Sequence, residues 1–455
     1  MDATSFETIA GWAEGKLVAG EPGDMVSVVC TDTRALKAGD FFVALRGENF
    51  DAHTFVAEAA KRGAAGAMVQ EIPAGLPAGF AVVLVQDTLA GLQNLATNYR
   101  RTLSLQAVGL TGSNGKTSTK DLTASVLGEH FQVTSTDGNL NNHIGVPLTL
   151  LRARGSDQVG VFEFGMNHPG EIAPLAAMAA PDVAIITNVG MAHIEFMGSR
   201  EAIAVEKGML AEALQPGGTL ILSAHDEFSP AIAARTKADV VMAGIGIGDV
   251  FASELRPYFS GTKFRLHADG HSVEAGLSVP GEHMVRNAVL AAAAGRVFGL
   301  SLEECAEGLT KLRLTKGRLE QKVIRGIQIL DDTYNANPDS VAAALRTLSS
   351  MPAAGRRIAV LGRMGELGSE AERGHREVGE IAAHEHIDCV VGVGDEAQWI
   401  TDAAWRGGVE KVVRVGSTEE ATKALRELAK AGDVVLIKGS RSAKMERIVE
   451  GLQTP

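Results

Sequence analysis

The feature that most constrains this chain is a glycine-rich turn within Gly109–Asp121, which reads G-L-T-G-S-N-G-K-T-S-T-K-D. An apolar run, Leu105–Leu110, precedes the turn and predicts a buried strand. Leu122, Val126 and Leu127 follow it at the spacing of one helix face. A strand, a glycine-rich turn and a helix in this order predict a phosphate-binding loop, because the curled backbone and the helix N-terminus direct N–H groups at an anion.

The loop predicts that the chain binds a nucleoside triphosphate. Lys116 would contact the β- and γ-phosphates, and the Thr117 hydroxyl would bind a magnesium ion. Leu110 stands where the usual eight-residue pattern has its first glycine, and the alternative is a helix-capping turn beside a surface lysine. The strand before the turn and the helix after it favour the nucleotide. The loop residues predicted to bind it are Gly112, Ser113, Asn114, Gly115, Lys116, Thr117 and Ser118.

Size, charge and cysteine content describe an ordinary soluble protein. The chain has 455 residues, enough for several domains, and its formal net charge of −12 argues against broad binding to nucleic acids or anionic membranes. Cys30, Cys305 and Cys389 have no metal or redox spacing, which favours a reduced protein over a disulfide scaffold. We find no signal-peptide pattern and no membrane-spanning apolar run, so we expect a cytoplasmic protein.

The order of strands and helices predicts an α/β protein with three domains. Residues 1–100 would form an N-terminal α/β domain, residues 101–314 a central domain of the phosphate-loop ATPase type, and residues 315–455 a Rossmann-like domain with a doubly wound parallel sheet. Within the last, Gly392–Ala397 matches a dinucleotide-binding fingerprint. No acidic residue follows at the distance that ribose binding needs, so we interpret it as a tight strand-to-helix turn.

Two polar clusters outside the loop are candidate ligand sites. Thr33 and Arg34, in a T-D-T-R segment, end a predicted strand in the first domain, where open α/β sheets place their ligands. Asn139, Asn141 and Asn142 lie close together in the central domain, and three amides in this spacing suit a sugar or a pyrophosphate. In both clusters ordinary turn chemistry is the alternative.

Two further predicted strands deliver side chains that could hold magnesium. Glu163 ends one of these strands, and His193 lies in the loop after the next. With Thr117 they form a candidate metal shell, because this hard cation prefers carboxylate and hydroxyl oxygens, although histidine is an unusual ligand for it. Lys207 follows on a predicted helix, where a solvated lysine near Glu206 is the simpler interpretation.

These motifs resemble those of the Mur ligase family over the whole length of the chain. Members of that family are ATP-dependent amide-bond ligases with a domain for a UDP-sugar, a domain for ATP and a mobile Rossmann-like domain. The matching motifs are T-G-S-N-G-K-T in the phosphate loop, E-F-G-M-N from Glu163, T-N-V-G-M-A-H up to His193, Lys207, the helix of Asn287, G-R-L-E at 317–320 and K-G-S-R at 438–441.

Three stretches resemble one branch of the family, which adds D-alanyl-D-alanine to UDP-N-acetylmuramoyl-tripeptide: G-N-L-N-N-H-I-G-V-P, D-D-T-Y-N-A-N-P-D-S-V and V-L-G-R-M-G-E-L-G. Y-N-A-N-P is the most specific, since sister ligases typically carry an A-H-x-P type sequence there. The D-N-P-R motif of the diamino-acid ligases is absent. The chain departs from the family at Arg363, Gly365 and His143, which concern recognition of the dipeptide and the sugar.

The resemblance implies a reaction through an acyl phosphate, with ATP and Mg²⁺ as cofactors and with UDP-N-acetylmuramoyl-tripeptide and D-alanyl-D-alanine as substrates. It implies a second magnesium beside His193 and Lys207, a lysine that this family carbamylates. We expect Lys116, Glu163, His193 and Lys207 to be the catalytic residues. We expect a monomer. Residues implied to contact the nucleotide are Asn287, Arg318 and Asp332, and those implied to contact the substrates are Thr33, Arg34, Asn139, Asn141, Asn142, Tyr334, Asn335 and Asn337.

Two other functions stay open on the sequence. A folylpolyglutamate synthase-type ligase has the same architecture and chemistry, but that class begins almost at its phosphate loop, whereas about 100 residues precede the loop here. The second is an ATP-driven switch, which would hydrolyse nucleotide without a peptide substrate.

Overall fold

The computed structural model describes residues 1–47, 50–258, 260–312 and 315–453, so Leu314, the last residue of the predicted central domain, lies outside the described residues. The chain forms two compact units. The first contains Met1–Leu110, His130–Gly165 and Gly170–Val183, and the second contains Thr111–Glu129, Met166–Pro169 and Ala184–Pro455. None of the helices within the described ranges is long and apolar enough to cross a bilayer.

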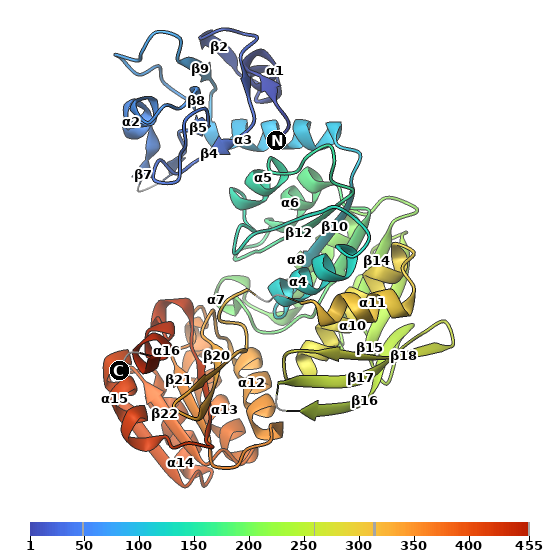
Figure 1. The fold of residues 1–455 in the computed structure, drawn as a ribbon, viewed down its shortest axis with the longest axis vertical. Helices are drawn as coiled ribbons and strands as arrows, with labels where there is room; N and C mark the ends of the chain where they lie inside the picture. The colour runs from blue at the N-terminus through green and yellow to red at the C-terminus, as the bar shows by residue number, and fades with distance from the viewer. Residues whose placement is uncertain (48–49, 259, 313–314, 454–455) are drawn as a thin grey trace. The chain divides into compact units, whose positions relative to one another are not determined.

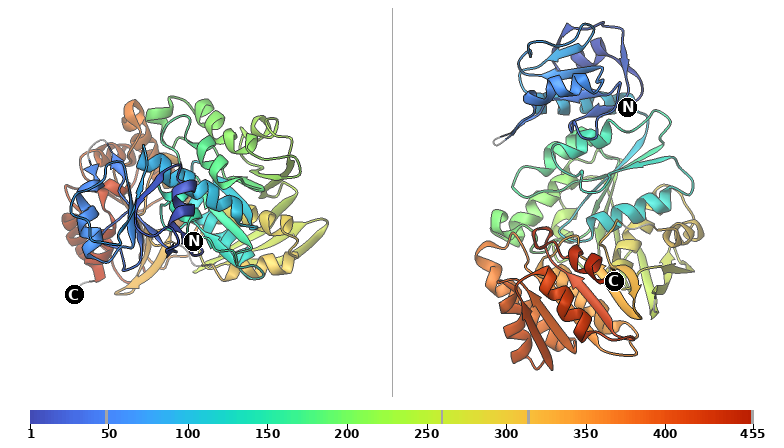
Figure 2. Two further views of the ribbon diagram at one scale, coloured as in Figure 1. Left: turned by 90° about the horizontal axis from the view of Figure 1, so that it is seen from above. Right: turned by 60° about the vertical axis from the view of Figure 1, so that its left-hand side comes forward.

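The first unit begins with an α/β segment. Its elements are β1 (Thr4–Ser5), α1 (Phe6–Trp12), β2 (Lys16–Ala19), β3 (Met25–Val26), β4 (Val29–Cys30), β5 (Phe41–Val43), β6 (Arg46–Gly47), β7 (Phe50–Asp51), α2 (Val56–Lys61), β8 (Gly66–Val69), β9 (Ala81–Leu84) and α3 (Thr88–Thr102). Five strands form a sheet in the order β2-β9-β8-β5-β4, in which only β2 is antiparallel to its neighbour. This sheet is blue in Figure 2.

Helices cover both faces of this N-terminal sheet. Phe41 contacts Phe6 of α1, with ring centroids 5.7 Å apart. The next residue, Phe42, packs in a buried cluster with Val56 of α2. Because successive strand residues point to opposite faces, α1 and α2 lie on opposite sides of the sheet.

The rest of the first unit supplies the strand that leads into the phosphate loop. Its elements are β10 (Gln106–Thr111), β11 (Val133–Ser135), α5 (Gly145–Leu150), β12 (Val159–Glu163) and α6 (Ile172–Ala179). β12 pairs in parallel with both β11 and β10, and its register sets Glu163 opposite Leu110. All five residues of β12 are buried, as expected for a parallel strand that is covered on both faces.

The second unit begins with the helix that follows the phosphate loop. Its elements up to residue 310 are α4 (Lys116–Leu127), β13 (Val183–Ile186), α7 (Ile194–Met197), α8 (Arg200–Glu212), β14 (Thr219–Ser223), α9 (Ser229–Ala233), β15 (Asp239–Ile245), β16 (Val250–Tyr258), β17 (Gly261–Ala268), β18 (His271–Leu277), α10 (Glu282–Val297) and α11 (Leu302–Thr310). Strands β14, β15 and β16 are parallel, and β16, β17 and β18 form an antiparallel meander.

Helix α10 packs on α4, and its buried face contains many alanines and Gly295. A Cβ atom at Gly295 would lie 2.7 Å from Cγ1 of Val126 on α4, so a larger residue there would separate the two helices. This contact supports the helix that begins at the phosphate loop.

The C-terminal part, residues 320–453, forms a six-stranded sheet. Its elements are β19 (Glu320–Ile324), β20 (Ile327–Asp332), α12 (Pro338–Ser350), β21 (Arg357–Gly362), α13 (Ala371–His384), β22 (Cys389–Val393), α14 (Ala397–Arg406), β23 (Lys411–Val415), α15 (Thr418–Leu428), β24 (Val434–Lys438) and α16 (Glu446–Gln453). The order is β19-β20-β24-β21-β22-β23, and every pair except β19 with β20 is parallel. Figure 1 shows α12 and α13 on one side and α15 and α16 on the other.

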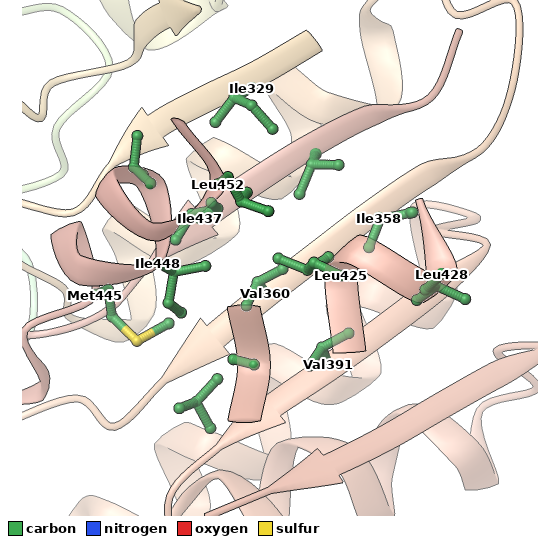
Figure 3. Packing of buried hydrophobic residues seen from close by; sticks show 14 of the residues in the cluster. Ile329, Ile358, Val360, Val391, Leu425, Leu428, Ile437, Met445, Ile448 and Leu452 are labelled. Carbon is green, nitrogen blue, oxygen red and sulfur yellow. The ribbon is translucent and has the colours of Figure 1, made fainter. Parts of the chain in front are cut away.

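The core of this C-terminal sheet lies between its strands and the pair α15 and α16. Val360, Val391 and Ile437 project from three strands toward Leu425 and Ile448 of these helices, and all five are almost fully buried (Figure 3). Helices α12 and α14 contact the same strands from the other side, so both faces are covered and the strands are continuous apolar runs.

The predicted parallel sheet is correct for five of these six strands. β19 is different, because it pairs antiparallel with β20 through a hairpin at Arg325 and Gly326, whose φ angles are +53° and +77°. Two residues with positive φ match the right-handed twist of a hairpin. The fingerprint-like Gly392–Ala397 segment is a strand-to-helix turn, as predicted, since β22 ends at Val393 and α14 begins at Ala397.

Candidate active site

The phosphate loop connects β10 to α4, and neighbouring residues fix its backbone. Gly115, the residue before α4, has a φ of +79°, which favours glycine. The Ser113 amide donates to the Asn188 carbonyl over 2.9 Å, and the Asn114 amide donates to Asn188 Oδ1 over 2.9 Å. The Thr187 hydroxyl donates to the Asn114 carbonyl over 2.6 Å. The end of β13 therefore holds the loop in its curled form.

The predicted cationic and hydroxyl groups lie at the start of α4. Lys116 Nζ donates to the carbonyls of Gly112 and Ser113, over 2.7 and 3.3 Å. Thr117 and Ser118 are buried in the first turn of the helix. A positive side chain, a helix N-terminus and a curled loop thus lie together, which is what a polyphosphate requires.

Two predicted nucleotide-contacting residues meet this loop. A Cβ atom at Gly115 would lie 2.5 Å from Asn287 Oδ1, so the amide of α10 lies directly against the loop. Arg318 Nη2 donates to the Thr117 hydroxyl over 3.4 Å, and the Arg318 guanidinium lies 4.1 Å from the centre of the Tyr334 ring. Tyr334, which was predicted to contact substrate, therefore makes a cation–π contact with an arginine beside the phosphate loop.

Asp332 has a buried partner that the sequence analysis did not single out. Asp332 ends β20 and Lys438 ends β24, and the parallel register sets them side by side. Lys438 Nζ donates to Asp332 Oδ2 over 2.6 Å and to the Asn335 carbonyl over 2.9 Å. Burial lowers the pKa of Lys438, whereas the Asp332 charge opposes that shift. The K-G-S-R motif combined with the strand register could have predicted this pair.

The C-terminal part also contacts the phosphate loop and the loop after β13. Asn337 caps α12 through Ser340, and its Nδ2 donates to Asn114 Oδ1 over 2.8 Å. Asp339 Oδ2 accepts the Met191 amide over 2.9 Å. Asp339 was missed because an acidic residue in the first turn of a helix is usually explained by the helix dipole.

Lys207 and His193 are the other predicted groups of the second unit. Lys207 is 1% exposed on α8, and among the described residues we find no hydrogen bond to its side chain. Its burial, and next the nearby Lys116 charge, hold its pKa well below the usual lysine value. The solvated lysine that sequence analysis favoured is therefore wrong. His193 Nδ1 lies 2.5 Å from Glu366 Oε2.

Glu163 belongs to the first unit, at the end of the strand beside β10. The side chain is 1% exposed, and its Oε1 accepts from Asn141 Nδ2 over 2.8 Å. The other oxygen, Oε2, is buried and has no hydrogen-bond partner among the residues that the structure describes. A buried carboxylate oxygen without a hydrogen bond costs free energy, so we expect a ligand to bind it.

The remaining predicted residues make mainly local contacts. Arg34 forms a bidentate pair with Asp32 and lowers the pKa of that carboxyl to about 2. The Thr33 carbonyl accepts from Arg62. The Asn142 side chain accepts the amides of residues 144 and 145 at the start of α5, and Asn139 accepts the Asn141 amide through its carbonyl. Turn chemistry, the alternative in both clusters, accounts for these contacts.

Glu163 and Thr117 each carry the kind of donor atom that magnesium takes. Within the described ranges no three His, Cys, Asp or Glu side chains gather as a metal site. The predicted shell of Thr117, Glu163, His193 and Lys207 contains only two residues of these types. A bare carboxylate oxygen on Glu163 and a hydroxyl on Thr117 are the hard oxygen donors that Mg²⁺ prefers.

Comparisons with known proteins match nearly the whole chain. The family model described as the Mur ligase middle domain matches residues 110–295, and the one described as the Mur ligase glutamate ligase domain matches residues 317–441. UDP-N-acetylmuramoyl-tripeptide–D-alanyl-D-alanine ligase of Bacillus subtilis is 38% identical, over 93% of this chain and 92% of that protein.

Two solved structures are similar over the same length. MurF from Acinetobacter baumannii has a TM-score of 0.91 and 33% identity, with all of both chains covered. MurF ligase from Thermotoga maritima in complex with ADP has a TM-score of 0.83 and 29% identity, with 94% of this chain and 97% of that chain covered.

Replacing Gly115 with alanine should weaken nucleotide binding by about tenfold or more, or ~1.4 kcal/mol. The new Cβ would lie 2.5 Å from Asn287 Oδ1 in a backbone with φ +79°. Gly299→Ala is the matched control, because Gly299 has φ +85° and nothing within 4 Å of the new atom. Equilibrium binding of a fluorescent ATP analogue measures the effect. Equal losses in the two variants would mean that strain alone, and not the contact with Asn287, is responsible.

Proposed function

Because this chain belongs to the Mur ligase family, we propose that it is the ATP-dependent ligase that joins D-alanyl-D-alanine to UDP-N-acetylmuramoyl-tripeptide. The product is the UDP-muramoyl pentapeptide of peptidoglycan synthesis, and ADP and phosphate are released. The observation that carries the proposal is the 38% identity to a ligase of that name over 93% of the chain. The phosphate loop and its partners supply the matching chemistry.

The reaction needs ATP because a carboxylate is a poor electrophile. Transfer of the γ-phosphoryl group to the tripeptide carboxylate gives an acyl phosphate and ADP. The neutral amine of D-alanyl-D-alanine then attacks the acyl carbon, and phosphate leaves as the amide forms. Such transfers depend mainly on positioning and on neutralising charge, so cations and N–H donors are the expected catalytic groups.

Lys116 and the loop amides would hold the β- and γ-phosphates, and Thr117 with Glu163 would hold Mg²⁺. The bound metal would neutralise charge on the phosphates. The parallel register between Leu110 and Glu163 supports this assignment, because β10 continues directly into the phosphate loop. The unpartnered Oε2 of Glu163 supports it independently.

Asn287, Arg318 and Asp332 would contact the nucleotide from three different segments. Arg318 and Asp332 belong to the stretch that follows residue 315, and Arg318 already contacts Thr117. A nucleotide that binds both Lys116 and Arg318 would hold these segments together. That closure would exclude water from the acyl phosphate, which hydrolyses if water has access.

Lys207 would act as a carbamate. Its amine is buried and burial lowers its pKa, which favours the neutral amine, the form that can attack CO₂. The new N–C bond gives a carbamate and releases one proton. This step converts the neutral amine into an anion, and the carbamate together with His193 would hold the second magnesium.

Each of the three predicted domains would bind a different ligand of the reaction. We propose that residues 1–100 hold the UDP-sugar, residues 101–314 hold the ATP and residues 315–455 hold the incoming dipeptide. The residues that would contact the substrates are Thr33, Arg34, the Asn139–Asn142 group, Tyr334, Asn335 and Asn337. Arg363 lies 3.4 Å from Glu396, so the family departure at this position has a local charge partner. Three free cysteines agree with a cytoplasmic enzyme, and we propose that it acts as a monomer.

An assay of ADP release tests the proposed reaction. We expect release only when UDP-N-acetylmuramoyl-tripeptide and D-alanyl-D-alanine are both present, because the acyl phosphate forms on one and is consumed by the other. A panel of glutamate and other amino acids should give no stimulation. ADP release by nucleotide alone would instead indicate an ATP-driven switch.

Lys116→Ala and Glu163→Ala should each lower kcat on the order of 10²- to 10³-fold, because each removes a charge that stabilises the transferring phosphoryl group. Lys423→Ala and Glu427→Ala, which change exposed residues of α15, are the matched controls. Circular dichroism would verify that all four variants fold. Near-normal turnover in either site variant would contradict the assignment of the triphosphate and metal.

Labelled bicarbonate should produce a carbamate signal on Lys207. We expect a ¹³C resonance in the wild type after equilibration with ¹³C-bicarbonate at neutral pH, and none in Lys207→Met. The signal should weaken as the pH falls, because protonating the amine removes the nucleophile. A wild-type spectrum without the resonance would leave Lys207 as a buried amine with another role.

A further inference from the structure

His193 and Glu366 are two residues with unusual backbone conformations that meet side chain to side chain. His193 has φ +64° and precedes α7, and Glu366 has φ +60° in the loop that follows β21. Neither residue is glycine, so both pay a steric cost for this conformation. Strained residues are retained where the surrounding structure requires them, and they cluster at functional sites.

The surrounding contacts hold the two loops together. His193 Nδ1 lies 2.5 Å from Glu366 Oε2, and the Glu195 amide donates to the Glu366 carbonyl over 3.4 Å. A Cβ atom at Gly368 would lie 3.0 Å from Cγ of Glu195, so the two loops pack closely. The pairing therefore involves both backbone and side chain.

Charge decides which atom carries the proton. The Glu366 carboxyl faces Nδ1 of His193, and a glutamate side chain that is ionised at neutral pH can only accept a hydrogen bond. Nδ1 of His193 must then carry the hydrogen, which leaves the lone pair of a neutral ring on Nε2.

We propose that Glu366 is a positioning residue that fixes the ring and tautomer of His193 so that Nε2 is presented to a divalent cation. This inference rests on the proposed metal role of His193. A metal-binding histidine commonly donates its other N–H to a carboxylate, which orients the ring and raises its basicity. Here the carboxylate belongs to the C-terminal part. The His193 ring is therefore oriented for the cation only when the loop of Glu366 lies against the loop of His193.

The tautomer can be measured without metal or substrate. Long-range ¹H–¹⁵N spectra of the full-length protein with ¹⁵N-labelled histidine, recorded above the histidine pKa, report which nitrogen carries hydrogen, and His193→Gln identifies the resonance. We expect the Nδ1–H form in the wild type and a shift toward Nε2–H in Glu366→Ala. Glu377→Gln, at an exposed residue of α13, should leave the spectrum unchanged. An unchanged tautomer in Glu366→Ala would overturn the proposal.

A magnesium titration of ADP formation tests the consequence. We expect Glu366→Ala to raise the half-saturating Mg²⁺ concentration by about 10- to 100-fold, with much of kcat recovered at high Mg²⁺. Glu366→Gln retains an acceptor oxygen and should have an intermediate effect. A shifted tautomer with wild-type Mg²⁺ dependence would overturn the link to the cation. If His193→Ala also left Mg²⁺ dependence unchanged, the metal role of His193 itself would be wrong.

Discussion

The curled backbone of the phosphate loop is the constraint on which the rest of the second unit depends. A loop that binds phosphate must direct N–H groups at the anion and turn its carbonyls away. The Asn114 carbonyl is held by the Thr187 hydroxyl and by Asn188 Nδ2, over 2.6 and 3.1 Å. Because two donors fix this carbonyl, it does not repel the phosphates. Asn287, Arg318 and Asn337 then contact a loop that is already shaped.

Two lysines are buried to a similar extent, but their surroundings differ. Lys438 and Lys207 are 2% and 1% exposed, and burial lowers the pKa of both. Lys438 has a paired carboxylate on the neighbouring strand, so its charge is compensated and it holds Asp332 in place. For Lys207, among the described residues, the Glu206 charge opposes the shift, while burial and the Lys116 charge favour the neutral amine. The first arrangement suits a structural ion pair and the second suits a reactive amine.

Local patterns in the sequence predicted the elements well, while contacts between distant segments were harder to predict. The phosphate loop, the strand that ends at Glu163 and the helix of Asn287 follow from apolar periodicity and turn residues. The burial of Lys207 could not be predicted this way, because a lysine in a helix has the same local pattern whether it is solvated or enclosed. Asp339 and Glu366 were missed for a related reason, since their partners lie 148 and 173 residues away.

The position of the last strand has a consequence for synthesis of the protein. β24 lies between β20 and β21, and the Lys438–Asp332 contact joins residues 106 positions apart. As the ribosome releases the chain, β20 and β21 emerge long before the strand that must separate them. The sheet therefore cannot assemble until almost the whole polypeptide is available. An incomplete nascent chain would lack Lys438, so Asp332 would stay without its buried ion-pair partner until synthesis is almost finished.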